Sequence, residues 1–290
     1  MTPAERIASV RALVNDKNQN LLVRIATALL LVPVLFCVSQ GGLVFALLIA
    51  FAAAAAAREL HVMAVGPLDA GGVFGMAFAA LFALSAFDAT PALTPGGVAS
   101  AAVIVLFVER LFAAEEADVT PELPRRVALA VLGCVYPGLL LSALVLLRER
   151  FGVWWVVLAL TVTWTNDTGA YFAGRALGRH KMYPKISPAK TWEGAAGGLA
   201  ASIAGALVVQ HFWLSDSLSV AAASLIGAGA AVLGPLGDLS ESMLKRSFGV
   251  KDSGALLPGH GGMLDRIDAL LFVAPFVLAC ARVLATRQGP

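Results

Sequence analysis

Apolar runs of about twenty residues recur along this chain, from residue 21 to residue 285. A helix of about 20 apolar residues spans the hydrocarbon core of a bilayer. Only 14% of the residues are charged, whereas soluble globular chains average about 25%. The runs lack the strict alternation of barrel strands, and a helix satisfies its own backbone hydrogen bonds in lipid. The sequence therefore predicts an all-α polytopic integral membrane protein.

About nine of these runs are predicted to be transmembrane helices. An odd number of spans places the two chain termini on opposite sides of the membrane. One side would then carry 17 of the 21 Lys and Arg residues and the other side 4, and cytoplasmic loops are the ones enriched in these residues. We therefore expect a cytoplasmic N-terminus and a C-terminus on the opposite side. The predicted spans are 21–38, 41–57, 71–88, 95–112, 126–147, 153–170, 194–213, 217–236 and 268–285.

Polar residues are sparse in the predicted spans before residue 150 and gather after it, which divides the chain into two predicted regions. Residues 1–150 would form an N-terminal amphipathic segment, for which a solvated arm is the alternative, and a scaffold of about five spans. Residues 151–290 would carry the functional site, with cytoplasmic loops at 171–193 and 237–267. The apolar positions of the amphipathic segment are Ile7, Val10, Leu13 and Val14.

The first polar cluster lies near the end of a predicted span, where Asn166 and Asp167 follow an apolar run. An ionised side chain at the centre of a membrane helix costs about 2.5–3.5 kcal/mol on insertion scales. We therefore expect Asp167 to face a cavity or a partner. The alternative is that Asp167 lies at the membrane interface and caps a helix.

The second polar cluster is a basic segment, "RHKMYPKISPAKTWEG", at residues 179–194. Pro184 and Pro188 forbid a continuous helix, so an irregular loop is predicted. Its cations could donate to phosphate oxygens or to lipid headgroups, although a plain cytoplasmic loop would have the same composition. Thr191 is a candidate cap for the helix that follows. The basic residues are Arg179, Lys181, Lys185 and Lys190.

The third cluster places carboxylates beside basic residues around the last loop. Asp238 and Glu241 are three residues apart, as are Asp265 and Asp268, and this spacing puts both members of a pair on one face of a helix. Oxygen ligands suit Mg²⁺, which is held by one or two carboxylates together with water and substrate phosphates. Glycines within 259–262 would let the backbone approach a phosphate. The cluster therefore indicates phosphate-bearing substrates and a divalent cation. The neighbouring basic residues are Lys245, Arg246, Lys251 and Arg266.

The segment "SMLKRSFGVKDSGALLPGHGGMLDRID", residues 242–268, resembles the signature of the phosphatidate cytidylyltransferases, also called CDP-diacylglycerol synthases. "NDTGAYFAGRALGR" and "ISPAKTWEG" are similar to two upstream blocks of that family. The resemblance is strong over residues 160–285 and only architectural before them. One departure is visible, because Ala189 stands where the family has the first of two successive lysines. This removes one phosphate contact and leaves the rest of the block.

The resemblance implies transfer of the cytidylyl group of CTP to phosphatidate, giving CDP-diacylglycerol and pyrophosphate for phospholipid biosynthesis. It implies Mg²⁺ as a cofactor, and a second, monovalent cation stays an open alternative. The implied partner is membrane lipid, and no nucleic acid is implied. By analogy it also implies a homodimer, in a bacterial-type inner membrane with the active site facing the cytoplasm. Catalytic roles would fall to Asp238, Asp265, Lys251 and His260, and the metal would be held by Asp238, Asp265 and Asp268. The implied substrate-binding residues are Asp167, Ser187, Lys190, Lys245, Arg246, Gly261, Gly262 and Arg266.

Two other functions stay open from the sequence. A related membrane enzyme could use CTP to phosphorylate a lipid alcohol, and analysis of the lipid product would separate it from a cytidylyltransferase. A cation-coupled transporter could instead use Asp167 and the later aspartates as a cation site, and it would show transport without nucleotide turnover. The scarcity of charged residues in the first five spans counts against the transporter.

Overall fold

The computed structural model describes residues 31–87, 93–113, 122–256 and 261–288, and each predicted span contains a helix within them. A π-helix, η2 (Val135–Leu139), joins α6 to α7, and two short strands, β1 (Lys181–Tyr183) and β2 (Ser187–Thr191), form an antiparallel hairpin. The α-helices are α2 (Leu31–Gln40), α3 (Gly42–Ala64), α4 (Ala70–Ser85), α5 (Pro95–Ala113), α6 (Glu122–Cys134), α7 (Leu140–Phe151), α8 (Val153–Leu177), α9 (Trp192–Trp213), α10 (Val220–Ser247) and α11 (Leu264–Gln288).

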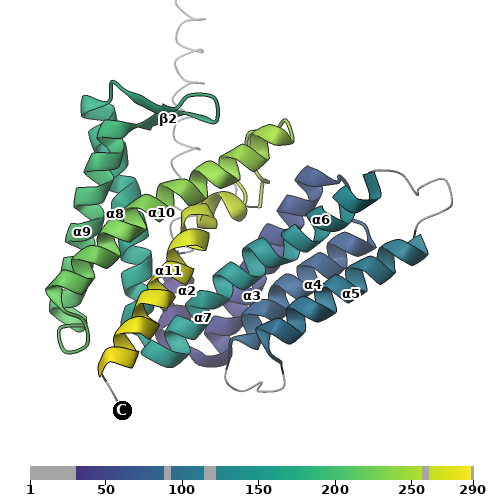
Figure 1. The fold of residues 1–290 in the computed structure, drawn as a ribbon, viewed down its shortest axis with the longest axis horizontal. Coiled ribbons are helices and arrows are strands. Elements are labelled where there is room, and N and C mark those ends of the chain that lie inside the picture. Colours follow the sequence, from purple (N-terminus) through teal and green to yellow (C-terminus); the bar gives the residue numbers. More distant parts are fainter. Residues whose placement is uncertain (1–30, 88–92, 114–121, 257–260, 289–290) are drawn as a thin grey trace, which may run out of the picture.

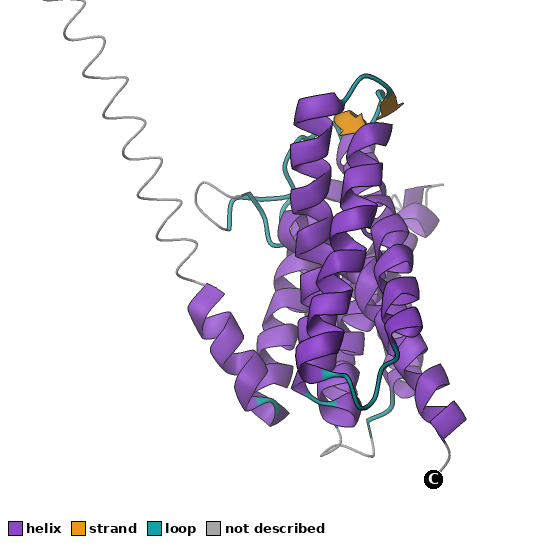
Figure 2. Cartoon of the chain, turned by 90° about the vertical axis from the view of Figure 1, so that its left-hand side faces the viewer, coloured by secondary structure: helices purple, strands orange, loops and turns teal. Residues whose placement is uncertain are grey.

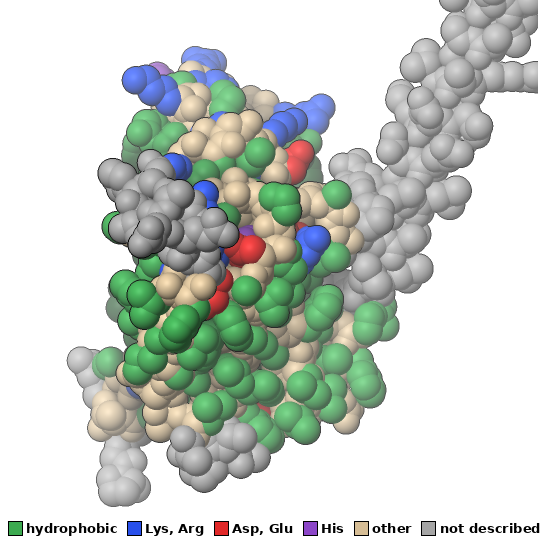
Figure 3. Space-filling view, turned by 90° about the vertical axis from the view of Figure 1, so that its right-hand side faces the viewer, with side chains coloured by type: hydrophobic (Ala, Val, Ile, Leu, Met, Phe, Trp, Pro, Cys, Tyr) green, Lys and Arg blue, Asp and Glu red, His purple; other side chains and the backbone are tan. Residues whose placement is uncertain are grey.

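The helices pack into one bundle with the last two helices in its middle. In Figure 1, α8 and α9 lie on the left, α3 to α6 lie on the right, and α10 and α11 run between them. Buried side chains from both sides form one continuous apolar core. Large apolar side chains such as Phe51, Phe107 and Leu225 also cover the outside of the bundle, and hydrophobic groups dominate the lower part of the face in Figure 3. Such an outer surface suits lipid as the surrounding solvent.

Six helical stretches of the described chain are long and apolar enough to cross a membrane, so the prediction of an integral membrane protein agrees with the structure. Helix α4 is apolar but shorter. The count of nine spans and the orientation of the termini therefore stay predictions. The predicted amphipathic segment and the first part of the span 21–38 lie outside the described residues. The six stretches are Gly42–Ala64, Pro95–Phe112, Leu123–Phe151, Trp192–Trp213, Val220–Ser247 and Leu264–Thr286.

The two predicted cytoplasmic loops contain more regular structure than the sequence indicates. Helix α8 continues to Leu177 and α10 continues to Ser247, beyond the ends of their apolar runs. A helix needs no apolar side chains where it leaves the lipid, so hydropathy misses these polar extensions. The hairpin β1–β2 occupies the proline-containing part of the first loop, as a β addition to the predicted all-α fold. Figures 1 and 2 place the hairpin at the end of the bundle opposite the C-terminus.

Short polar side chains mark where several helices begin. Asp69, Thr191 and Ser219 cap α4, α9 and α10, and each accepts a hydrogen bond from the backbone N–H three residues further along. Such caps satisfy amide groups that have no partner within the helix. The predicted cap at Thr191 is therefore confirmed, and it fixes the point at which β2 passes into α9.

Small residues allow α8 and α9 to pack with their backbones close together. A Cβ added at Gly197 would lie 2.9 Å from the carbonyl oxygen of Gly169, and one added at Gly205 would lie 2.7 Å from the Thr165 hydroxyl oxygen. Small residues at helix contacts are typical of membrane proteins, because close approach maximises dispersion contacts. The glycine-rich face at 194–206 therefore serves packing within the chain.

Candidate functional site

A cavity of about 320 Å³ lies between α8, the hairpin, the start of α9 and α10. Four residues predicted to be functional line it, namely Asp167 from α8, Ser187 and Lys190 from β2, and Asp238 from α10. The hairpin turns back towards α8 and then continues into α9 through the cap at Thr191. This connection places Lys190 opposite α10, so residues far apart in the sequence share one cavity.

The ion pair between Lys190 and Asp238 crosses this cavity. The Nζ atom of Lys190 lies 2.6 Å from Oδ2 of Asp238 and 3.5 Å from the carbonyl oxygen of Pro235. One turn further along α10, the Ser242 hydroxyl donates to Oδ1 of Asp238 at 3.2 Å. The Asp238 carboxylate is therefore held at both oxygens while its side chain stays 36% exposed.

Asp268 approaches Asp238 because α10 and α11 pack closely at Gly237. A Cβ at Gly237 would lie 2.5 Å from the carbonyl oxygen of Asp268, so a larger residue would push the helices apart. Asp167, Asp238 and Asp268 interact electrostatically with one another, and Lys190 acts on all three. This group therefore sets three carboxyl groups against one lysine.

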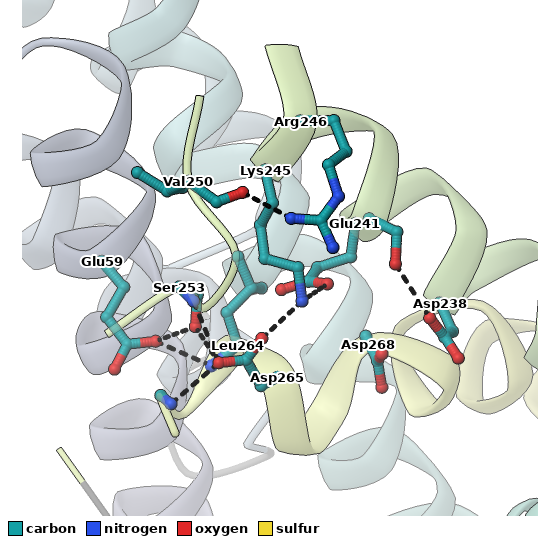
Figure 4. Close-up of polar contacts among 12 residues, drawn as sticks. Glu59, Asp238, Glu241, Lys245, Arg246, Val250, Ser253, Leu264, Asp265 and Asp268 are labelled. Atoms are coloured by element: carbon teal, nitrogen blue, oxygen red, sulfur yellow. Dashed lines mark hydrogen bonds and ion pairs between the residues drawn. The ribbon is translucent and has the colours of Figure 1, made fainter. Parts of the chain in front are cut away.

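A second polar group is centred on Lys245, as Figure 4 shows. Its Nζ atom lies 2.5 Å from Oε2 of Glu241 and 2.5 Å from Oδ1 of Asp265. Glu241 is fully buried, and Lys245 is 9% exposed. Buried charges persist in folded proteins when they are paired in this way. Lys245 therefore ties the end of α10 to the start of α11.

Asp265 also organises the loop between α10 and α11. Its Oδ2 atom accepts hydrogen bonds from the Ser253 N–H at 3.0 Å, the Ser253 hydroxyl at 2.9 Å and the Gly262 N–H at 2.9 Å. Both oxygens of Asp265 thus carry protein donors. The Gly262 N–H, predicted as a phosphate donor, is directed to Asp265 here, while Gly261 adopts a φ of +81° that favours glycine.

Three other predicted residues lie on the surface, and one lies outside the described residues. Nη1 of Arg246 donates to the carbonyl oxygen of Val250 at 2.8 Å and so stabilises the turn after α10. Lys251 and Arg266 are exposed, and His260 falls in the undescribed segment 257–260. The structure therefore brings together Asp167, Ser187, Lys190 and Asp238 at the cavity, and Lys245 and Asp265 beside the loop. Asp268 interacts electrostatically with Asp238 and Asp167.

Two residues of the first half, which the sequence presents as scaffold, also reach these groups. Glu59 of α3 accepts hydrogen bonds from the α10–α11 loop. Tyr136 lies on η2 with a buried hydroxyl that has no hydrogen-bond partner among the described residues. It interacts electrostatically with Asp238, Glu241 and Asp268. A π-helix often occurs at a functional site, and the proline that follows Tyr136 was the one sequence signal of an irregular helix there.

The carboxyl groups of Asp167, Asp238 and Asp268 suit a divalent cation in the type of ligand that they offer. In the described part of the chain, no three His, Cys, Asp or Glu side chains lie close enough together to hold a metal ion. Asp167, Asp238 and Asp268 nevertheless offer only oxygen ligands, which Mg²⁺ prefers, and they outnumber the one lysine that acts on them. The donor chemistry of this group therefore fits Mg²⁺.

Comparison with known proteins agrees with the signature at residues 242–268. A phosphatidate cytidylyltransferase of Bacillus subtilis is 34% identical over 275 residues, which cover 90% of this chain and 96% of the relative. One of Brucella suis is 43% identical over 161 residues, covering 54% of this chain and 58% of the relative. One of Staphylococcus haemolyticus is 47% identical over 126 residues, covering 43% of this chain and 48% of the relative. The matches to the Brucella and Staphylococcus proteins thus span about half of their length.

The family assignment rests on a match along nearly the whole chain. Residues 22–284 match the sequence profile of the cytidylyltransferase family. This range contains α2 to α10, the hairpin and almost all of α11, and therefore both polar groups of the site. The chain belongs to the cytidylyltransferase family.

Proposed function

We propose that this protein transfers the cytidylyl group of CTP to phosphatidate, giving CDP-diacylglycerol and pyrophosphate. A phosphate oxygen of phosphatidate forms a new bond to the α-phosphorus of CTP. The bond between that phosphorus and the oxygen bridging to the β-phosphate breaks, and pyrophosphate leaves with the electron pair. Membership of the cytidylyltransferase family supports this reaction, as do relatives that carry the name phosphatidate cytidylyltransferase.

The observation that carries the proposal is the cavity in which Lys190 meets Asp238 and Asp167. The lysine can bind phosphate oxygens, and the carboxylates can bind a divalent ion. Both substrates carry phosphate groups that need such cations. Lys and Arg side chains also gather at the top of the molecule in Figure 3, above the apolar lower part. A lipid phosphate could therefore meet a soluble nucleotide here while its acyl chains stay between apolar helices.

The mechanism needs positioning more than a strong base. The phosphatidate nucleophile is a phosphate monoester, and by analogy with phosphorylated side chains its second pKa is about 6. It is therefore largely anionic at neutral pH, and we assign no base role to His260. The difficulty is to bring two polyanions together, and we propose that Lys190, Lys245 and Arg246 bind phosphate oxygens and orient the substrates.

We further propose that the reaction depends on Mg²⁺ held by Asp238 and Asp268, with Asp167 beside them. Asp265, which the family resemblance adds to this set, has both oxygens occupied by Lys245, Ser253 and Gly262 here. When bound, Mg²⁺ would neutralise part of the negative charge of the phosphates, including the charge that develops on pyrophosphate. The surplus of carboxylates over Lys190 supports this proposal. The Ser242 hydroxyl would keep the Asp238 carboxylate in one orientation.

We propose a multi-pass protein of a bacterial inner membrane, with the cavity on the cytoplasmic side. The hairpin lies at the end of the bundle away from the C-terminus (Figures 1 and 2), and the Lys and Arg bias of the sequence assigns that end to the cytoplasm. CTP is available on that side. A homodimer stays a prediction that rests on family analogy.

The test is pyrophosphate release by the purified protein in detergent, with CTP, phosphatidate and Mg²⁺. We expect CDP-diacylglycerol as the lipid product, dependence on Mg²⁺, and loss of turnover in Asp238→Asn. Lys185→Ala, on the exposed turn of the same hairpin, is the control variant. A phosphorylated lipid alcohol as the product would replace this proposal with a lipid kinase. Cation transport without nucleotide turnover would replace it with a transporter.

A further inference from the structure

Glu59 is a buried carboxylate of the first half that holds the loop between α10 and α11, as Figure 4 shows. Its side chain is 3% exposed. Its Oε2 atom accepts a hydrogen bond from the Leu264 N–H at 2.9 Å and lies 2.9 Å from the Ser253 hydroxyl, whose single proton it shares with Asp265. Its Oε1 atom accepts one from the Met263 N–H at 2.8 Å. Three donors from the signature segment thus converge on one side chain of α3.

The N–H groups that Glu59 accepts lie at the start of α11. The first amides of a helix have no partner within it, and the helix dipole favours negative charge at this end. Glu59 therefore caps α11 from another helix. These donors and the dipole offset the cost of burying its charge.

Two glycines of the signature segment make room for the Glu59 carboxylate. A Cβ added at Gly254 would lie 2.7 Å from Oε1 of Glu59. A Cβ added at Gly262 would approach Ser253 and Glu59 even more closely. The sequence explains Gly262 by close approach to a phosphate, whereas the structure gives a reason for both glycines, which is close approach to Glu59.

Ser253 links Glu59 to the charged groups of the site. Its hydroxyl lies 2.9 Å from Oε2 of Glu59 and 2.9 Å from Oδ2 of Asp265, and Oδ1 of Asp265 pairs with Lys245. A change at Glu59 would therefore move Ser253 and the first turn of α11 together. That turn carries Asp265, and Asp268 follows on the next turn.

We propose that Glu59 is a positioning residue of the cytidylyltransferase, which fixes the α10–α11 loop and the start of α11 so that Asp265 and Asp268 face Lys245 and Asp238. The expected effect of Glu59 on turnover rests on the proposed function. Its hold on the α10–α11 loop and on the start of α11 does not depend on that function. Glu59 contacts no substrate in this role. It makes the N-terminal half part of the catalytic unit.

The test compares Glu59→Gln and Glu59→Leu with wild type in turnover and in hydrogen exchange of residues 253–264. Gln keeps the shape but has one acceptor oxygen, so at least one amide of α11 loses its partner; Leu removes every acceptor. We expect kcat to fall about 10-fold or more in Gln and further in Leu, with KM for CTP changed less than about 3-fold. Exchange at Met263 and Leu264 should rise about 10-fold while α8 and α9 stay protected.

Matched variants separate positioning from general damage. Glu149→Gln also removes a carboxylate that accepts a backbone N–H, from Gly42 at the opposite end of α3, and should leave exchange in the loop unchanged. In a double-mutant cycle, Ser253→Ala should add little to Glu59→Gln, because both act through one network. If Glu59 only filled space, Leu would be tolerated as well as Gln.

The outcomes also separate this proposal from the proposed function. An inactive wild type whose loop is protected, and loses protection in Glu59→Gln, would reject the reaction and keep the positioning role. An active wild type matched by Glu59→Leu in both kcat and loop exchange would reject the positioning role and keep the reaction.

Discussion

Gly237 lies against the backbone carbonyl of Asp268, so α10 and α11 meet with no side chain between them. The next residue of α10, Asp238, is therefore brought beside Asp268, and both interact electrostatically. One glycine thus determines the separation of two carboxylates that come from different helices. The geometry of the cavity depends on this contact as much as on the charged residues themselves.

Gly237→Ala should destabilise the protein and lower its activity. The added Cβ would lie 2.5 Å from the Asp268 carbonyl oxygen, so the helices must separate. Overpacking of this kind costs about 1–3 kcal/mol, which thermal unfolding in detergent would detect. Gly133→Ala is the control, since nothing lies within 4 Å of a Cβ there. Equal unfolding temperatures for Gly237→Ala and wild type would contradict the proposed role of the close contact.

Lys190→Ala should lower kcat/KM on the order of 100-fold. The variant loses the cation that pairs with Asp238 and acts on Asp167 and Asp268, which leaves three carboxylates to repel incoming phosphates. Pyrophosphate release at saturating Mg²⁺ measures the effect. Lys185→Ala removes an exposed lysine of the same hairpin and should keep most of the activity. If both variants lose the same activity, general charge at the surface explains the result better than the cavity does.

Asp265→Asn and Asp268→Asn should differ in stability although both lose activity. Asp265 accepts hydrogen bonds at both oxygens, including two from backbone amides, and pairs with Lys245. Leaving a buried donor without its partner costs about 1–3 kcal/mol, or more for a charge. Asp268 accepts a hydrogen bond from the Ala269 N–H and faces the like charges of Asp238 and Asp167. We expect a clear fall in unfolding temperature for Asp265→Asn alone. A larger fall for Asp268→Asn would contradict the view that Asp265 is the residue that stabilises the fold.

Asp69 gives the stability of the α3–α4 turn a dependence on pH. Burial alone would raise the pKa of the Asp69 carboxyl, but hydrogen bonds from Arg110 and Gly72 and the charges of Arg110 and His61 outweigh it and hold the pKa below 3.8. The ionised Asp69 carboxylate therefore stabilises the folded state in full above pH 3.8. This stabilisation is lost as the pH falls through the lower pKa of the folded state. Because the side chain is 37% exposed, the contribution is small.

Asp69→Asn isolates this charge, since Asn also caps helices well. The variant should unfold at a lower temperature than wild type near pH 7, and the difference should shrink as the pH falls below 3.8. Asp216→Asn, in the exposed turn before α10, should show no such convergence. A difference that grows on acidification would mean that the sign of the pKa shift is wrong.

The apolar helices could be predicted from the sequence because lipid imposes one simple requirement on each span. Hydropathy found the helices but not the polar ends of α8 and α10, where helix continues without apolar side chains. The hairpin was missed because β1 and β2 have only three and five residues, which is too short for a pattern. The prolines at 184 and 188 correctly excluded a continuous helix there.

The candidate site was predictable where several charged residues share one segment, and not where a single residue comes from elsewhere. Asp238, Asp265 and Lys245 were marked by their spacing and by the signature. Glu59 and Tyr136 stand alone in apolar helices, and only the packing of α3 and η2 against α11 brings them to the site. Local pattern carries no information about such contacts.

The distance in sequence between Glu59 and its partners has a consequence for biosynthesis. Leu264 follows Glu59 by 205 residues, so α3 must enter the membrane long before the amides that its carboxylate accepts have been made. Helix α11 completes the loop, so the enzyme would acquire activity only after α11 has been synthesised. A nascent chain stalled before α11 would hold an unsatisfied acid at the end of α3, which is a feature that quality-control proteases could recognise.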